Sequence, residues 1–381
     1  MLVLGAVGAA ATALALSGIL QHLARLRGVG EIAVPAPARV LLVGCALALA
    51  LAVALASPPV GRRDLLASGL AALGALAVLV TVPDPFAVAA LLLLLAAGQA
   101  ARPGRRPLPL RMRGPALAAL LLALGWLLVR TPGPPVLGRV GALALALALV
   151  AAAGLVPYLA DFEPEEPTSA SGLAWTAYFG PALALSLPAR VLPALTLEEG
   201  TVFAAALIGV GLVNLAWGTV AAWGTASDAG AWRYSFLADW GLALVGLGLL
   251  LPEGMSAAFL ALLGIVLVRL PLYLWARPSL LRGARARLGP VNVLVALLLA
   301  GAAPFSGFPV RVLVLQAATR LAWPLAMVLL LAMLVWVAHA FRLAGSIGRP
   351  AGRTALGVVV ALALSAALGL VPGLFLRAGG L

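Results

Sequence analysis

The stretch LLLAGAAPFSGFPVRVLVLQAATR, residues Leu297 to Arg320, decides the fold of this chain. It is apolar enough to lie in a membrane, yet Pro304, Gly307 and Pro309 interrupt it near its middle. Because proline removes a backbone donor and clashes with the preceding turn, we expect a broken helix. Broken helices at membrane depth are buried in protein or line watery cavities, and they build ion sites in transporters. Arg311 follows the interruption and is a candidate functional residue, because ionisable side chains inside spans are usually functional.

The composition places most of the chain in a lipid bilayer. Hydrophobic residues make up 64% of 381 residues, charged residues only 10%, and the mean hydropathy is +1.14. Soluble domains carry about 25% charged residues. The net charge of +13 comes entirely from arginine, and in so apolar a chain it indicates cytoplasmic loops and not nucleic-acid binding. The sequence therefore predicts an all-α, multi-pass protein of a bacterial cytoplasmic (inner) membrane.

Thirteen apolar stretches come close to the roughly 20 residues that a transmembrane helix needs. They are 2–22, 38–57, 65–83, 86–101, 115–130, 137–158, 169–190, 200–223, 234–251, 255–275, 290–319 (the broken one), 322–341 and 354–375. The first lacks a preceding basic region, so we expect a retained span and not a cleaved signal peptide. Arginines follow the second, fourth, tenth and twelfth spans, which places those loops and the N-terminus in the cytoplasm. Arg25, Arg27 and Arg39 in the first loop are exceptions.

Two proline-rich interruptions about five spans apart predict an internal repeat. The first lies in VPYLADFEPEEPTSAS, residues 156–171, and includes Pro157; the second surrounds Pro304. Corresponding broken helices in two halves are typical of inverted-repeat transporters. We therefore expect a single transmembrane domain over 1–381. Its predicted parts are two inverted five-helix repeats at about 65–190 and 200–341, with flanking helices in 1–57 and 354–375.

Three further polar residues inside predicted spans are candidates for an ion path. Asp239 is either a titratable group in a half-channel or an interfacial carboxylate near Arg233. His339 suits a proton shuttle because histidine titrates near neutrality, but the nearby Arg342 favours an interfacial position. Asn214 lies in the middle of its span, where an interhelical hydrogen bond is favoured over water coordination.

The remaining polar features predict no cofactor or metal. Asp161, Glu163, Glu165 and Glu166 form an acidic run, but no histidine or second acidic cluster accompanies it. A solvated loop or a contact with a basic partner subunit is the expected role, since a metal site needs more ligands. The single Cys45 lies in an apolar run and cannot form an intrachain disulfide. The sequence contains no glycine-rich phosphate loop and no nucleophile motif.

Four stretches resemble the antiporter-like membrane subunits of respiratory complex I, which are similar to the large subunits of Mrp-type cation/proton antiporters. They are residues 67–102, 156–171, AWRYSFLADWGLALVGLGL at 231–249, and LLLAGAAPFSGFPVRVLVLQAA at 297–318. The last resembles the family pattern LLSLAGIPPxAGFxGKFLLFQAA most specifically, because Pro304, Gly307, Phe308 and a cation fall in register. Asp239 occupies a position where the family often has a histidine.

The resemblance implies proton transfer through two linked half-channels, carried in the family by a glutamate and a row of mid-membrane lysines. The glutamate position falls near Leu93 in this chain, and the lysine positions fall on Ala152, near Phe179 or Gly180, and on Arg311. Of these four positions, only that of Arg311 is charged. Arginine stays protonated in proteins, so it is a poor proton carrier.

The sequence leaves several functions open. The resemblance implies a non-redox membrane subunit of a complex-I-like NADH–quinone oxidoreductase, contributing to or derived from a proton-translocation channel and assembled with other membrane subunits. The alternatives are a structural spacer that moves no protons and a cation/proton antiporter subunit. An unrelated lipid-acting enzyme would need an acidic or histidine cluster at one bilayer face, and only residues 161–166 come close. Polar groups and water at mid-membrane would favour a conducting subunit, and a dry midplane would favour the spacer.

Overall fold

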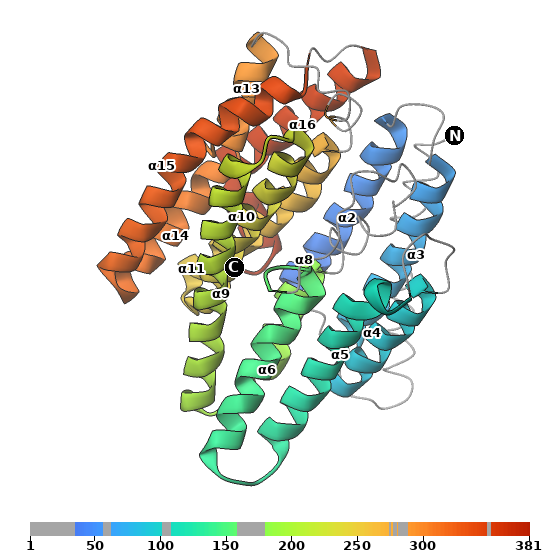
Figure 1. Cartoon of the computed structure of the whole chain (residues 1–381), viewed down its shortest axis with the longest axis vertical. Coiled ribbons are helices and arrows are strands. Elements are labelled where there is room, and N and C mark those ends of the chain that lie inside the picture. Colours follow the sequence, from blue (N-terminus) through green and yellow to red (C-terminus); the bar gives the residue numbers. More distant parts are fainter. Residues whose placement is uncertain are drawn as a thin grey trace.

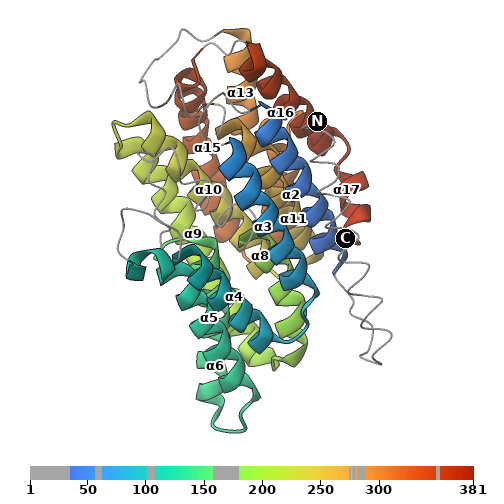
Figure 2. The same ribbon diagram turned by 90° about the vertical axis from the view of Figure 1, so that its right-hand side faces the viewer.

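The computed structural model describes residues 35–55, 62–100, 108–157, 180–273, 276, 280, 289–348 and 352–381. Every regular element in these ranges is a helix, as predicted, and the helices pack side by side (Figures 1 and 2). The first half contains α2 (Ala36–Leu55), α3 (Arg62–Thr81), α4 (Pro85–Ala100), α5 (Leu108–Arg130), α6 (Pro135–Ala153), α8 (Gly180–Val191) and the short η2 (Leu192–Ala194). The rest contains α9 (Leu197–Gly224), α10 (Asp228–Gly248), α11 (Pro252–Gly264), η3 (Ile265–Arg269), α13 (Pro290–Leu299), α14 (Gly307–Leu321), α15 (Trp323–Ser346), α16 (Gly352–Leu370) and α17 (Pro372–Ala378).

Four helices in the described ranges are long and apolar enough to cross a membrane. They are α6, α9, the continuous segment Pro252–Tyr273 and α15. The pair α16 and α17, bent by 80°, adds a fifth if it forms one span, and several shorter apolar helices accompany them. The predicted count of thirteen spans is therefore not confirmed, and the predicted span 2–22 lies outside the described residues. The helices that are described nevertheless lie close to the predicted ranges; predicted span 200–223, for example, is α9.

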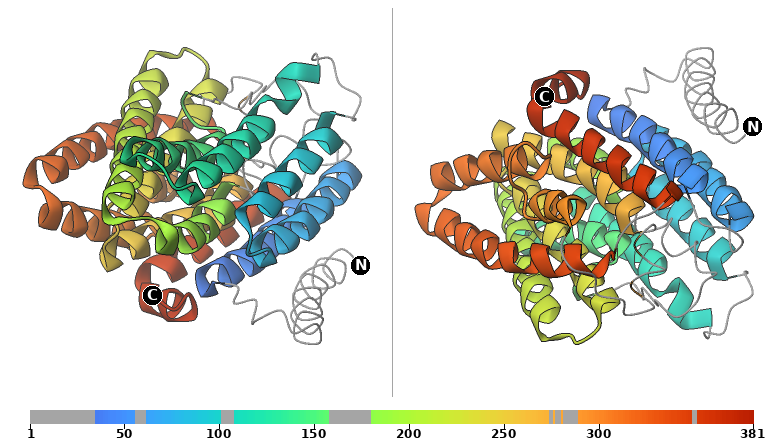
Figure 3. Two further views of the ribbon diagram at one scale, coloured as in Figure 1. Left: turned by 90° about the horizontal axis from the view of Figure 1, so that it is seen from below. Right: turned by 90° about the horizontal axis from the view of Figure 1, so that it is seen from above.

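The outer surface of the bundle is apolar, as a bilayer requires. Large apolar side chains are exposed along α15, among them Met327, Val328, Leu331 and Leu334. Viewed along the bundle, α15 lies at the periphery beside α14 (Figure 3). Soluble proteins rarely expose contiguous apolar patches of this kind. The exposed apolar face and the spanning helices together indicate a multi-pass membrane protein.

Close helix packing at the centre of the chain depends on glycine. The helices α9 and α10 pack together extensively. A Cβ atom at Gly211 would lie 2.9 Å from the carbonyl oxygen of Gly241, and one at Gly218 would lie 2.7 Å from the backbone nitrogen of Ala238. Small residues allow this approach, and packing of this kind drives helix association where lipid is as apolar as protein. The pair thereby fixes α10, which carries Asp239, against the rest of the bundle.

Both predicted interruptions are present, and their backbones have the same geometry. After α6 the chain turns at Gly154, with a φ of +67°, and Pro157 follows three residues later. After α13 it turns at Gly301, with a φ of +64°, and Pro304 again follows three residues later. At each turn the glycine N–H bonds to the carbonyl three residues back, and the next N–H bonds to the carbonyl five residues back. This Schellman arrangement caps a helix end and needs a left-handed residue, which explains the two glycines.

The second interruption begins earlier than the sequence predicted. The non-helical segment runs over residues 300–306, and α14 begins at Gly307. Pro304 lies inside the break as predicted, but Gly307 and Pro309 lie in the first turn of α14 and are not part of the break. A proline is tolerated there because the first-turn N–H groups have no intrahelical partner. The acidic run at 161–166, which is part of the first predicted interruption, and Phe179 lie outside the described residues.

Candidate functional site

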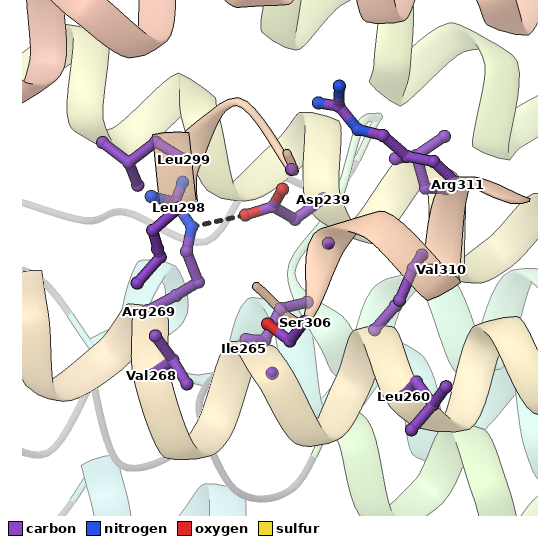
Figure 4. Close-up of a pocket in the computed structure, with 15 residues that line it drawn as sticks. Asp239, Leu260, Ile265, Val268, Arg269, Leu298, Leu299, Ser306, Val310 and Arg311 are labelled. Atoms are coloured by element: carbon purple, nitrogen blue, oxygen red, sulfur yellow. Dashed lines mark hydrogen bonds and ion pairs between the residues drawn. The ribbon is translucent and has the colours of Figure 1, made fainter. Parts of the chain in front are cut away.

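A cavity of about 60 Å³ lies between α10, the segment Pro252–Tyr273 and the second helix break (Figure 4). One water molecule needs about 10–15 Å³ of such space, so the cavity has room for more than one. Its polar lining side chains are Asp239, Arg269, Ser306 and Arg311, and most of the rest are apolar. We call Asp239, Arg269 and Arg311 the charged centre.

Asp239 and Arg269 form an ion pair inside the bundle. Arg269 Nε donates to Asp239 Oδ2 at 2.6 Å, and the side chains are only 26% (Asp239) and 8% (Arg269) exposed. Arg269 Nη2 donates to the hydroxyl of Ser235, at 2.5 Å. The guanidinium also lies 5.4 Å from the ring centre of Trp232 and 5.2 Å from that of Phe236, within cation–π range. Asp239 is therefore paired with Arg269 within the bundle, and its place in a half-channel or at the membrane interface stays a prediction.

A local irregularity of the backbone positions Arg269. It ends the π-helical turn η3, in which Leu270 N–H bonds to the Ile265 carbonyl five residues back. Pro271 follows directly and has no N–H to offer the carbonyl of residue 267, which loosens the preceding turn. Such π-helical turns are rare and are frequent at functional sites. The sequence around Arg269 therefore explains why the side chain leaves the regular α-helical register at the cavity.

Arg311 is the unpaired member of the charged centre. Within the described part of the chain it makes no hydrogen bond and no ion pair, although Asp239 attracts it electrostatically. Asp239 lies between Arg311 and Arg269 (Figure 4). The Arg311 side chain also lies against the turn at Gly301, because a Cβ atom there would lie 2.5 Å from Arg311 Nε. Two guanidinium groups thus share one carboxylate, and the centre carries a net charge of +1.

Side chains from other helices bind the backbone groups that the second break frees. Trp336 Nε1 in α15 donates to the Leu299 carbonyl at 3.1 Å. Ser306 N–H donates to the Ser365 hydroxyl in α16 at 3.1 Å, and the two hydroxyls are 3.0 Å apart. In a membrane no bulk water replaces lost backbone bonds, so such partners are needed. They hold the break in a defined shape beside the cavity.

Asn214 serves the first break in a similar way. Its side chain is fully buried in α9; Oδ1 accepts from Val156 N–H at 3.0 Å, and Nδ2 donates to the Val156 carbonyl at 3.2 Å. Nδ2 also donates to the Val210 carbonyl of its own helix at 2.9 Å. Asn214 therefore makes the interhelical hydrogen bonds that the sequence favoured, and a part in an ion path stays a prediction.

His339 lies apart from the cavity. It is 3% exposed and packs between the rings of Trp336 and Trp223, with centroids 5.2 Å and 5.1 Å away. Its Nε2 atom is buried and has no hydrogen-bond partner in the described ranges. Arg342, three residues on, donates to the carbonyls of Ala222 and Thr225 at the end of α9. The structure therefore does not bring His339 together with Asp239 and Arg311.

The first half has a mostly apolar interior where the structure describes it, apart from half-buried Arg190 in α8, whose Nη2 donates to the carbonyls of Leu79 and Val80. Leu93, near the expected glutamate position, is 48% exposed, whereas Ala152 and Gly180 are buried. Between residues 62 and 191 the buried polar side chains in the described ranges are those of Thr81 and Ser186. The charged residues expected of a first half-channel are thus replaced by apolar ones.

Sequence reasoning missed Arg269, the most buried member of the charged centre. A signal was present, because an ionisable residue inside a predicted span, 255–275, is a functional candidate by default. The residue lies near the end of that span and shortly before four loop arginines, which made it look like a boundary residue. Only the folded structure shows that it faces Asp239.

No protein-family model and no curated protein sequence matches the chain. Several solved structures match the chain. A chain of the Mrp complex from Dietzia sp. DQ12-45-1b is 17% identical, with a TM-score of 0.69, over 98% of this chain and 51% of that one. A chain of respiratory complex I from Thermus thermophilus with bound NADH is 18% identical, with a TM-score of 0.69, over 100% of this chain and 97% of that one. A chain of the archaeal membrane-bound sulfane sulfur reductase is 16% identical, with a TM-score of 0.65, over 90% of this chain and 64% of that one.

This chain spans about half of the Mrp chain and less than two thirds of the sulfane sulfur reductase chain, but nearly all of the complex I chain. At identities below 20% these matches are a likeness of fold. The chain therefore has the fold of membrane chains from the Mrp, complex I and sulfane sulfur reductase assemblies, which confirms the resemblance to antiporter-like subunits that its sequence predicted.

Proposed function

We propose that this chain is an antiporter-like membrane subunit of a complex-I-like assembly, derived from a proton-translocation channel and no longer able to carry protons across by itself. The shared fold supports a place among other membrane subunits in such an assembly. The matching geometry at Gly154 and Gly301 supports two five-helix repeats, at about 65–190 and 200–341. The arginine-rich loops support a cytoplasmic N-terminus in a bacterial membrane.

The observation that carries the proposal is the difference between the two breaks. The first is closed by the amide of Asn214 in an apolar setting, and the second faces the charged centre. A proton relay needs side chains that gain and lose protons, and arginine stays protonated. Asp239 is the one carboxylate of the charged centre. A single carboxylate held against Arg269 does not make a route across the membrane.

Fixed charges have a structural use at a broken helix. A helix carries partial negative charge at its C-terminal end and partial positive charge at its N-terminal end. Arg269 lies near Leu298 and Leu299 at the C-terminal end of α13 (Figure 4). Arg269 therefore complements the negative end of α13, which is a reason to retain a charge there without proton transport.

The proposal is tested in the parent complex, purified with its native partners and reconstituted in vesicles. Asp239→Asn and Arg311→Gln are compared with the wild type for protons moved per electron transferred. We expect assembled variants to keep the ratio of the wild type. Arg139→Gln, which removes an exposed ion pair with Glu198, is the matched control for a charge change far from the cavity.

A conducting half-channel is the second candidate, because the cavity has room for water next to a carboxylate. In that case Asp239 takes up and releases the transported proton, and Asp239→Asn lowers the ratio while the complex stays assembled. A cation/proton antiporter subunit is distinguished by transport that requires a sodium or potassium gradient. Its support is the likeness to a chain of an Mrp complex.

A further inference from the structure

We infer that the cavity at the charged centre binds a small monovalent anion of the halide class beside Arg311. The inference goes beyond the proposed function. The two are related only because both involve the charged centre. It requires no proton movement and no partner subunit. Four features of the cavity lead to it: its net charge, an unused buried donor, an uncapped helix and its size.

The first feature is the charge of the cavity. Asp239 is paired with Arg269 through a 2.6 Å hydrogen bond, so the charge of Arg269 neutralises that of Asp239. Arg311 lines the same cavity and has no ion-pair partner in the described part of the chain. Arg311 is half-buried, so water solvates its charge less well than at an open surface. A single bound anion would bring the charged centre to neutrality.

The second feature is a donor that is not used. Arg269 is 7% exposed, and its Nε and Nη2 atoms are bonded to Asp239 and Ser235. Its third nitrogen, Nη1, is buried and has no partner in the described ranges. Buried polar groups almost always have a hydrogen-bond partner, and an exception often marks the position of a bound ion or water. This atom belongs to a residue that lines the cavity.

The third feature is the start of α14. This 15-residue helix begins at Gly307 beside the cavity, and Ser306 before it makes no side-chain cap. Phe308 N–H already bonds to the Phe305 carbonyl and Pro309 has no N–H, so the positive end of the helix favours an anion more than its N–H groups do. Alone, a helix N-terminus would not define a site. Here it points into a cavity that already holds one excess cation and one unbonded guanidinium nitrogen.

The fourth feature limits the size of the ligand. The cavity of about 60 Å³ accommodates an ion of water-like size together with water. An anion with a carbon skeleton, such as gluconate, is too large for it. Because the excess charge is a single positive one, a monovalent ion neutralises it and a divalent ion would overcompensate. Chloride meets both conditions and is the probe for the experiment.

The experiment measures chloride binding to the full chain, purified in mild detergent with any subunits that remain bound. The thermal unfolding midpoint is followed as sodium chloride replaces sodium gluconate at constant ionic strength, and radiolabelled chloride gives the stoichiometry. We expect a saturable rise of the midpoint and about one chloride per chain. Arg311→Gln should abolish the saturable component. Asp239→Asn removes the competing negative charge and should tighten chloride binding by about tenfold or more.

Three results would overturn the inference: equal effects of chloride and gluconate, no bound label, or wild-type binding by Arg311→Gln. If Arg311→Gln does not fold, Arg311→Lys and Asp239→Asn decide the question, and unchanged chloride affinity in both rejects the site. The assay involves no electron transfer and no proton gradient. Its failure is therefore distinct from failure of the proposed function, which is measured as protons per electron.

Discussion

The side-chain amide of Asn214 bonds to both backbone groups of Val156, accepting from its N–H at 3.0 Å and donating to its carbonyl at 3.2 Å. Asn214 lies in the middle of α9, and Val156 lies in the first break, 58 residues earlier in the chain. An amide side chain presents one acceptor and two donors, so it can replace a missing backbone partner on both sides. A single side chain thus pairs both backbone groups of Val156.

We expect Asn214→Leu to lower the free energy of unfolding by about 2 kcal/mol. The substitution leaves the N–H and carbonyl of Val156 buried without partners, and each such group costs about 1–3 kcal/mol, partly recovered by relaxation. Thermal unfolding in detergent measures the loss. Thr201→Val is the control on the same helix, because its hydroxyl is exposed and bonds only to a carbonyl of its own turn. An equal effect of both variants would contradict the role given to Asn214.

Asp239→Ala should destabilise the chain by about 3 kcal/mol, because it leaves Arg269 buried and unpaired. Replacing both partners by apolar residues, as in Asp239→Leu with Arg269→Met, should recover most of that loss. The exposed pair Arg139–Glu198, with side chains 49% and 64% exposed, is the matched comparison. Arg139→Ala should change stability by less than about 1 kcal/mol. Unfolding midpoints of the three variants test this order.

Gly301→Ala should lower the free energy of unfolding by more than the conformational strain of a left-handed alanine, which is about 1–2 kcal/mol. Gly301 has a φ of +64°, and the added methyl group would displace the Arg311 guanidinium. Gly209→Ala is the control, because that helical glycine has open space around it, and alanine there should stabilise by up to about 1 kcal/mol. Unfolding midpoints of both variants test the prediction, and similar behaviour of the two would show that the turn at Gly301 tolerates a side chain.

The sequence predicted much of this architecture for identifiable physical reasons. Long apolar stretches bounded by arginine and proline locate helices well, because the bilayer fixes their length and polarity. The break at Pro304 and the earlier one at Pro157 followed from proline chemistry alone. The prediction failed for Pro309, because a proline in a first helical turn and a proline in a break look alike in sequence.

The site was only partly predictable. Arg311 and Asp239 were found because charges inside apolar runs stand out. Their relationship to Arg269 was not predicted. It depends on a π-helical turn that brings Arg269 Nε within 2.6 Å of Asp239 Oδ2, although the two residues are 30 positions apart. The family position carried over to near Leu93 stays a prediction, because Leu93 is exposed although its neighbour Leu92 is fully buried. A shift of one residue in the alignment moves the position to another face of the helix, and a sequence pattern does not fix the alignment that closely.

The most direct test of the central claim uses a variant of the parent complex without charge at the centre. It combines Asp239→Leu, Arg269→Met and Arg311→Met, and it is reconstituted in vesicles beside the wild type. Protons translocated per electron pair and the rate of electron transfer are measured together. If the subunit no longer carries protons, the variant and the wild type should translocate the same number of protons per electron pair. A lower ratio at an unchanged rate of electron transfer would show that protons pass through the charged centre.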